Sequence, residues 1–96
     1  MNVDLESIDE LIRTQDIEGY IAEGAPEDEY APEIEEVFAQ LRALPVEQAG
    51  RERLIALLES VWKRDFSLST SELETRRSGF EAIADKILHF FVEGAA

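Results

Sequence analysis

Apolar residues recur every three to four positions through almost the whole chain of 96 residues. Such spacing places them on one face of an α-helix, whereas a half-buried strand would alternate apolar and polar residues. No extended alternation of that kind supports a strand. The apolar stripes lie near residues 5–12, 34–44, 54–66 and 80–91. We therefore expect an all-α fold, a single compact bundle of four to five short helices packed roughly antiparallel.

The length of the chain suits one domain, residues 1–96, with one modest core. We expect the last few residues, near Gly94, to fray. No apolar run is long enough to span a bilayer, and the acidic N-terminus is unlike a signal peptide. Without cysteine the chain has no disulfide and no thiolate metal ligand. A cytoplasmic protein is the simplest interpretation.

Three signals predict where helices begin and end. Asp16 is placed to cap a short helix over 17–23, and Gly24 follows as its end. Pro32 suits the first position of the next helix, where its missing amide proton costs nothing. Before the last helix, two overlapping Ser-x-x-Glu sequences are both candidate capping boxes, and they begin at Ser69 and Ser71.

The residues that usually carry catalysis are scarce. His89 is the sole histidine and lies four residues after Asp85, which favours a surface ion pair over a metal ligand or a general base. The acidic clusters lack the spacing of a calcium loop, and no glycine-rich phosphate loop occurs. We therefore expect no catalytic residue, no cofactor, no metal and no enzymatic activity. A weak metal-binding or enzymatic domain that uses Asp85, His89 and the carboxylates of residues 27–36 is the alternative.

Negative charge is concentrated in the first half of the chain. Residues 1–48 carry fourteen acidic residues against two basic ones, whereas residues 49–96 carry eight against seven. The net charge of −13 disfavours binding to nucleic acid and would steer the chain towards a basic protein. We expect a protein-interaction domain without a membrane or nucleic-acid partner. Its candidate surface is acidic and consists of Glu27, Asp28, Glu29, Tyr30, Glu33 and Glu36.

Two other functions fit the same charge. An immunity or antitoxin-like inhibitor would cover the site of a basic partner, and a nucleic-acid mimic would imitate the spacing of phosphates. The bases of the second half allow two interpretations as well. They form either a docking patch for an acidic partner or internal ion pairs with the acidic segment, and the latter is favoured; they are Lys63, Arg64, Arg76 and Arg77.

The last helix carries two adjacent aromatic residues, Phe90 and Phe91, which point about 100° apart on an α-helix. A wide buried stripe is the favoured interpretation. If Phe90 were exposed together with Val92, the pair would indicate a self-association or partner face. A homodimer through this helix is therefore a second possible partnership.

A motif after the predicted short helix resembles the YugE-like family of small bacterial proteins. It reads Gly-Ala-Pro-x-Asp-Glu-Tyr-x-x-Glu-Ile over residues 24–34, and the order of elements on either side also fits. The family consists of all-helical domains of unknown function. The resemblance thus implies a helical architecture and brings no activity, ligand or site residue with it.

Overall fold

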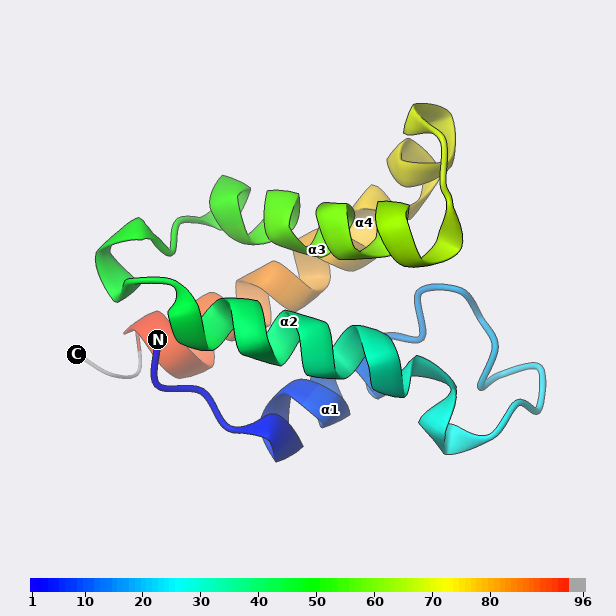
Figure 1. Ribbon diagram of the computed structural model, residues 1–96, viewed down its shortest axis with the longest axis horizontal. Helices are drawn as coiled ribbons and strands as arrows, with labels where there is room; N and C mark the ends of the chain where they lie inside the picture. Colours follow the sequence, from blue (N-terminus) through cyan, green and yellow to red (C-terminus); the bar gives the residue numbers. More distant parts are fainter. Residues whose placement is uncertain (94–96) are drawn as a thin grey trace.

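The computed structural model describes residues 1–93, apart from the side chain of Glu27, so the fraying predicted near Gly94 lies outside the described residues. Four α-helices follow one another, with a short 3₁₀ segment before α2 and another before α3 (Figure 1). The all-α fold of four to five helices is confirmed, and no strand occurs within residues 1–93. The roughly antiparallel packing of the whole bundle stays a prediction. The elements are α1 (Leu5–Gln15), η1 (Glu27–Tyr30), α2 (Ala31–Ala43), η2 (Val46–Gln48), α3 (Arg51–Phe66), α4 (Thr70–Ile87) and the π-helical η3 (Leu88–Glu93).

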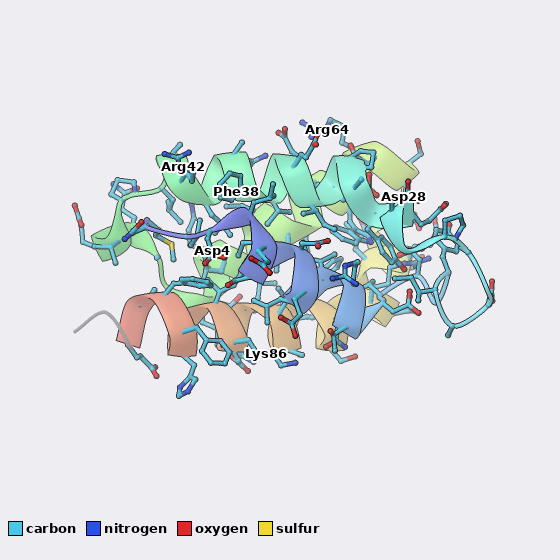
Figure 2. The ribbon with its side chains drawn as sticks, turned by 90° about the horizontal axis from the view of Figure 1, so that it is seen from below. Asp4, Asp28, Phe38, Arg42, Arg64 and Lys86 are labelled. Atoms are coloured by element: carbon cyan, nitrogen blue, oxygen red, sulfur yellow. The ribbon has the colours of Figure 1, made fainter. Side chains whose placement is uncertain are left out.

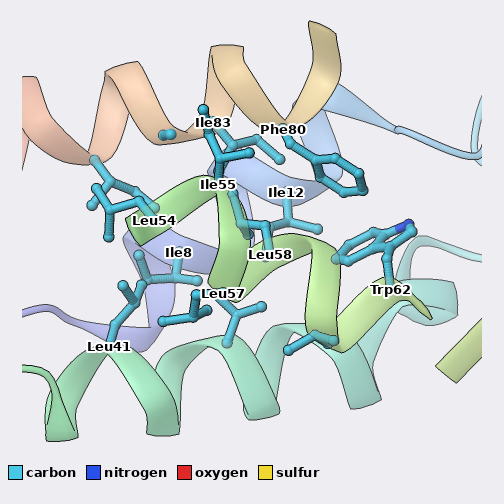
Figure 3. Close-up of a cluster of buried hydrophobic side chains, with 14 of the residues drawn as sticks. Ile8, Ile12, Leu41, Leu54, Ile55, Leu57, Leu58, Trp62, Phe80 and Ile83 are labelled. Carbon is cyan, nitrogen blue, oxygen red and sulfur yellow. The ribbon is translucent and has the colours of Figure 1, made fainter. Parts of the chain in front are cut away.

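Side chains from all four α-helices meet in one hydrophobic core (Figure 3). Ile8 and Ile12 enter it from α1, and residues of α2, α3 and α4 face them. Burial of each large apolar side chain contributes about 1.5–3 kcal/mol. At one end of the core an aromatic cluster surrounds Trp62, which is fully buried and touches the rings of Tyr30, Phe66 and Phe80. Through this cluster the segment over residues 16–30 packs against α3 and α4.

Two of the helices, α1 and α4, begin at a residue whose side chain caps the first turn. The Asp4 carboxylate accepts a hydrogen bond from the backbone N–H of Ser7 at 2.9 Å at the start of α1. At the start of α4, Ser69 and Glu72 form a complete capping box, so the first of the two predicted boxes is used. Pro32 occupies the second position of α2, because the helix begins at Ala31, one residue earlier than predicted.

The predicted short helix over 17–23 is wrong, because this segment forms a series of turns. Asp16 adopts the left-handed conformation (φ 47°) and ends α1. Gly19 (φ 75°) and Gly24 (φ 99°) then break any helical continuation. Asp16 nevertheless acts as a cap, since its carboxylate accepts hydrogen bonds from the backbone N–H groups of Ile21 and Ala22. The sequence therefore correctly predicted that Asp16 caps backbone N–H groups, but these groups belong to a series of turns and not to a helix.

Candidate interaction sites

The loop before α2 is fixed by a buried tyrosine. Tyr30 is completely buried, and its hydroxyl donates to Asp16 Oδ1 at 2.6 Å. The same hydroxyl accepts from the backbone N–H of Glu18 at 3.0 Å. Burial, reinforced by the neighbouring Asp16 carboxylate, raises the pKa of Tyr30. Burial also raises the pKa of Asp16, but the hydrogen bonds from Tyr30, Ala22 and Ile21 outweigh burial. The pKa of Asp16 is therefore lowered overall. Both groups therefore keep their usual protonation states, and the loop is held as a structural unit.

Glu18 joins this loop to α3 and α4. Its side chain is only 5% exposed and forms a bidentate ion pair with Arg76, through Nε at 2.6 Å and Nη2 at 2.9 Å. The indole Nε1 of Trp62 donates to the same carboxylate at 3.1 Å. A buried charge is tolerated when it is paired and hydrogen-bonded in this way. Glu18 thus has a structural role that the sequence did not reveal.

Glu33 is the other buried acidic side chain in the described part of the chain, with 5% of the residue exposed. Burial raises its pKa to about 7, and the nearby carboxylates of Asp65 and Glu29 add to the effect. This carboxyl therefore holds its proton to a higher pH than an exposed glutamate does. Three acidic groups from η1, α2 and α3 thus gather at one end of the bundle.

The structure narrows the predicted acidic surface. Tyr30 and Glu33 are buried, so they cannot form part of an accessible surface, and assigning them to one was wrong. Asp28 and Glu29 are exposed on η1 (Asp28 is labelled in Figure 2). Glu36 is partly exposed, pairs with Arg64 at 3.2 Å, and accepts a hydrogen bond from Gln40 at 2.9 Å. The side chain of Glu27 lies outside the described residues.

Most arginines of the second half are engaged in ion pairs within the chain. Arg77 contacts Glu52 at 3.0 Å and Glu59 at 3.4 Å, and Arg51 contacts Asp85 at 2.7 Å. Arg76 forms an ion pair with Glu18, and Arg64 forms one with Glu36. Three of the four bases considered as a docking patch therefore form ion pairs within the chain. The predicted pairing with the acidic segment is confirmed for Arg64 alone, because Arg76 and Arg77 pair with acidic residues outside that segment. No ion pair among the described residues involves Asp28 or Glu29, so the predicted neutralisation of the acidic segment is limited to Glu36.

The predicted pair of Asp85 and His89 is wrong. Asp85 binds Arg51, and His89 Nδ1 lies 3.9 Å from the carboxylate of Glu93, one turn further on. Within residues 1–93 no group of three histidine, cysteine, aspartate or glutamate side chains is arranged to hold a metal ion. Among the same residues, no helix is both long and apolar enough to cross a membrane.

A groove of about 390 Å³ lies between α1 and the end of α4 with η3. Leu11 and Phe91 contribute apolar surface and also pack against the core. Phe90 stands at its wall with 58% of its surface exposed, so the wide buried stripe predicted for this helix does not include it. Val92 is partly buried against the core and does not share the exposure of Phe90. The remaining lining residues are Ser7, Glu10, Thr14 and Lys86.

Sequence reasoning missed the roles of Asp16 and Glu18 because their partners lie up to 58 positions away. One local signal was present: Glu18 interrupts the apolar Ile17, Tyr20 and Ile21 group, where a charged residue requires a partner. The groove gave no sequence signal beyond the adjacent phenylalanines.

Comparisons with protein-family models, curated proteins and solved structures found no match. The resemblance to the YugE-like family therefore stays a prediction.

Proposed function

We propose that this chain is a non-enzymatic protein-interaction domain that binds a basic partner at the η1–α2 end of the bundle. The observation that carries the proposal is the charge arrangement at this end. Residues 27–36 contain six carboxylates and no basic residue. Among the described residues, Arg64 is the cation that pairs with this stretch, and it pairs with Glu36.

The raised pKa of Glu33 supports the same proposal. Burial and the carboxylates of Asp65 and Glu29 favour the neutral form of this side chain near neutral pH. A lysine or arginine brought by a partner would pair with the exposed carboxylates of Asp28 and Glu29 and so reduce the negative charge that surrounds the buried Glu33. Exposed carboxylates would also speed the encounter with a basic surface, and added salt would weaken it.

A pull-down from an extract of the native cells tests the proposal. The bait carries Asp28→Asn and Glu29→Gln, and the matched control carries Glu47→Gln and Glu74→Gln, which remove two exposed charges elsewhere. We expect the control to recover the same basic proteins as the wild type and the η1 variant to lose them. Equal recovery by all three baits, or recovery of none, would reject the proposal.

A further inference from the structure

The surface around the groove between α1 and η3 combines a projecting apolar side chain with a hollow, as a self-complementary interface requires. Phe90 is a largely exposed apolar side chain, and it stands directly beside a hollow with Leu11 and Phe91 among its lining residues. In a two-fold symmetric dimer the same patch occurs on both copies, so a projection and a hollow must lie next to each other on one surface. This is the arrangement of Phe90 and the groove.

The charges on the two walls point to a second copy as the occupant. Glu10 lies on the α1 wall and Lys86 on the α4 wall. Among the described residues, neither side chain has an ion-pair partner within the chain. A two-fold axis through the groove places α1 of one copy over α4 of the other, so that each wall meets a wall of opposite charge.

We propose that this groove is the interface of a symmetric homodimer, in which Phe90 of each copy enters the groove of the other and Glu10 faces Lys86 across the axis. The proposal is independent of the basic partner at the η1–α2 end, which lies on other residues. The contact rests on one aromatic anchor and one groove per copy, and both copies carry a net charge of −13. We therefore expect a weak dimer, with a dissociation constant of about 1–100 µM.

Salt separates this association from binding to a basic partner. Each copy carries a net charge of −13, so two copies repel at long range. Screening by added salt reduces that repulsion, and the dimer should tighten between about 0.05 and 0.5 M NaCl. Binding to a basic protein should weaken over the same range.

Sedimentation equilibrium of the full chain at several concentrations tests the interface. Phe90→Ser should weaken the dimer at least about tenfold, since a buried aromatic anchor is lost. Val46→Ser is the matched control, because Val46 is similarly exposed, at 47%, but lies on η2 away from the groove. Circular dichroism checks that each variant is folded. A chain that stays monomeric throughout, or equal behaviour of the two variants, would overturn the proposal.

A charge exchange tests the symmetry. Glu10→Lys changes the net charge from −13 to −11 and Lys86→Glu changes it to −15, so a general charge effect would move the two variants in opposite directions. The proposed pairing predicts that each variant alone loses dimer and that an equimolar mixture forms the heterodimer, as seen by native mass spectrometry. Failure of the mixture to associate more tightly than either variant would overturn the pairing.

Discussion

At the scale of single residues, Glu33 makes the stability of the fold depend on pH in an unusual direction. Its pKa rises from the ordinary 4.5 to about 7 on folding, mainly through burial. The folded chain therefore keeps a proton that the unfolded chain releases, and stability falls as pH rises from about 4.5 to about 7. Asp4 and Glu72 behave in the usual way: their pKa values are lowered, so the fold loses stability when these carboxylates become protonated in more acidic solution.

Glu33→Gln should remove most of this dependence. The neutral amide keeps the size of the side chain without the cost of a buried charge, so the variant should gain about 1–3 kcal/mol at pH 8 and little at pH 5. Urea denaturation at the two pH values measures the difference. Glu35→Gln, an exposed change on the same helix, is the control. A wild-type chain as stable at pH 8 as at pH 5 would contradict this assignment.

Glu18 should be the most sensitive acidic residue of the chain. Glu18→Ala leaves Arg76 without its bidentate partner and the indole of Trp62 without an acceptor. Leaving one member of a largely buried pair costs about 3–5 kcal/mol, although the partial exposure of Arg76 should reduce this to about 2–3. The fluorescence of Trp62, the sole tryptophan, follows unfolding directly. Glu23→Ala, on the exposed part of the same loop, should change stability by less than about 0.5 kcal/mol.

At the scale of secondary-structure elements, periodicity predicted the four long helices because each buries a continuous apolar stripe. It failed over residues 17–23, where Ile17, Tyr20 and Ile21 have helical spacing. There the left-handed conformations of Asp16 and Gly19 and the contacts to Tyr30 determine the backbone instead. The 3₁₀ segment over 27–30 and the π-helical end of α4 were likewise not predicted, since both depend on packing rather than on spacing.

The cap of α4 offers a direct test at this scale. Ser69→Ala removes the acceptor for the backbone N–H of Glu72 and should cost about 1 kcal/mol. Ser71→Ala is the matched control, because the overlapping Ser-x-x-Glu sequence that begins there does not form a box. Chemical denaturation of both variants measures the difference. Equal losses would mean that the two serines share the capping role.

At the scale of the whole molecule, the sequence predicted the helical class and most of the core, because local spacing determines both. The sequence could not predict which acidic side chains are buried in the folded chain. Glu33 and Glu35 both fit the first turns of a helix, yet one is buried beside Asp65 and the other is exposed. The candidate surface was therefore predicted only in part, with Asp28, Glu29 and Glu36 accessible and Tyr30 and Glu33 inside.

The distribution of charge over the molecule leads to the proposed function. Arginines of α3 and α4 are paired mainly with acidic residues of their own half, while Asp28 and Glu29 stand exposed at the end of the bundle. The excess of negative charge in the first half is therefore presented to solvent rather than neutralised internally. A partner with a basic surface would complement it.

The most direct measurement is an NMR titration of the isotope-labelled chain with a hexa-arginine peptide at low salt. The account predicts that amide shifts concentrate over residues 28–36 and around Arg64 and Asp65, and that they disappear as salt is raised. Asp28→Asn with Glu29→Gln should reduce them, whereas Glu47→Gln with Glu74→Gln should not. Shifts spread evenly over the surface, or centred on α4, would contradict the account.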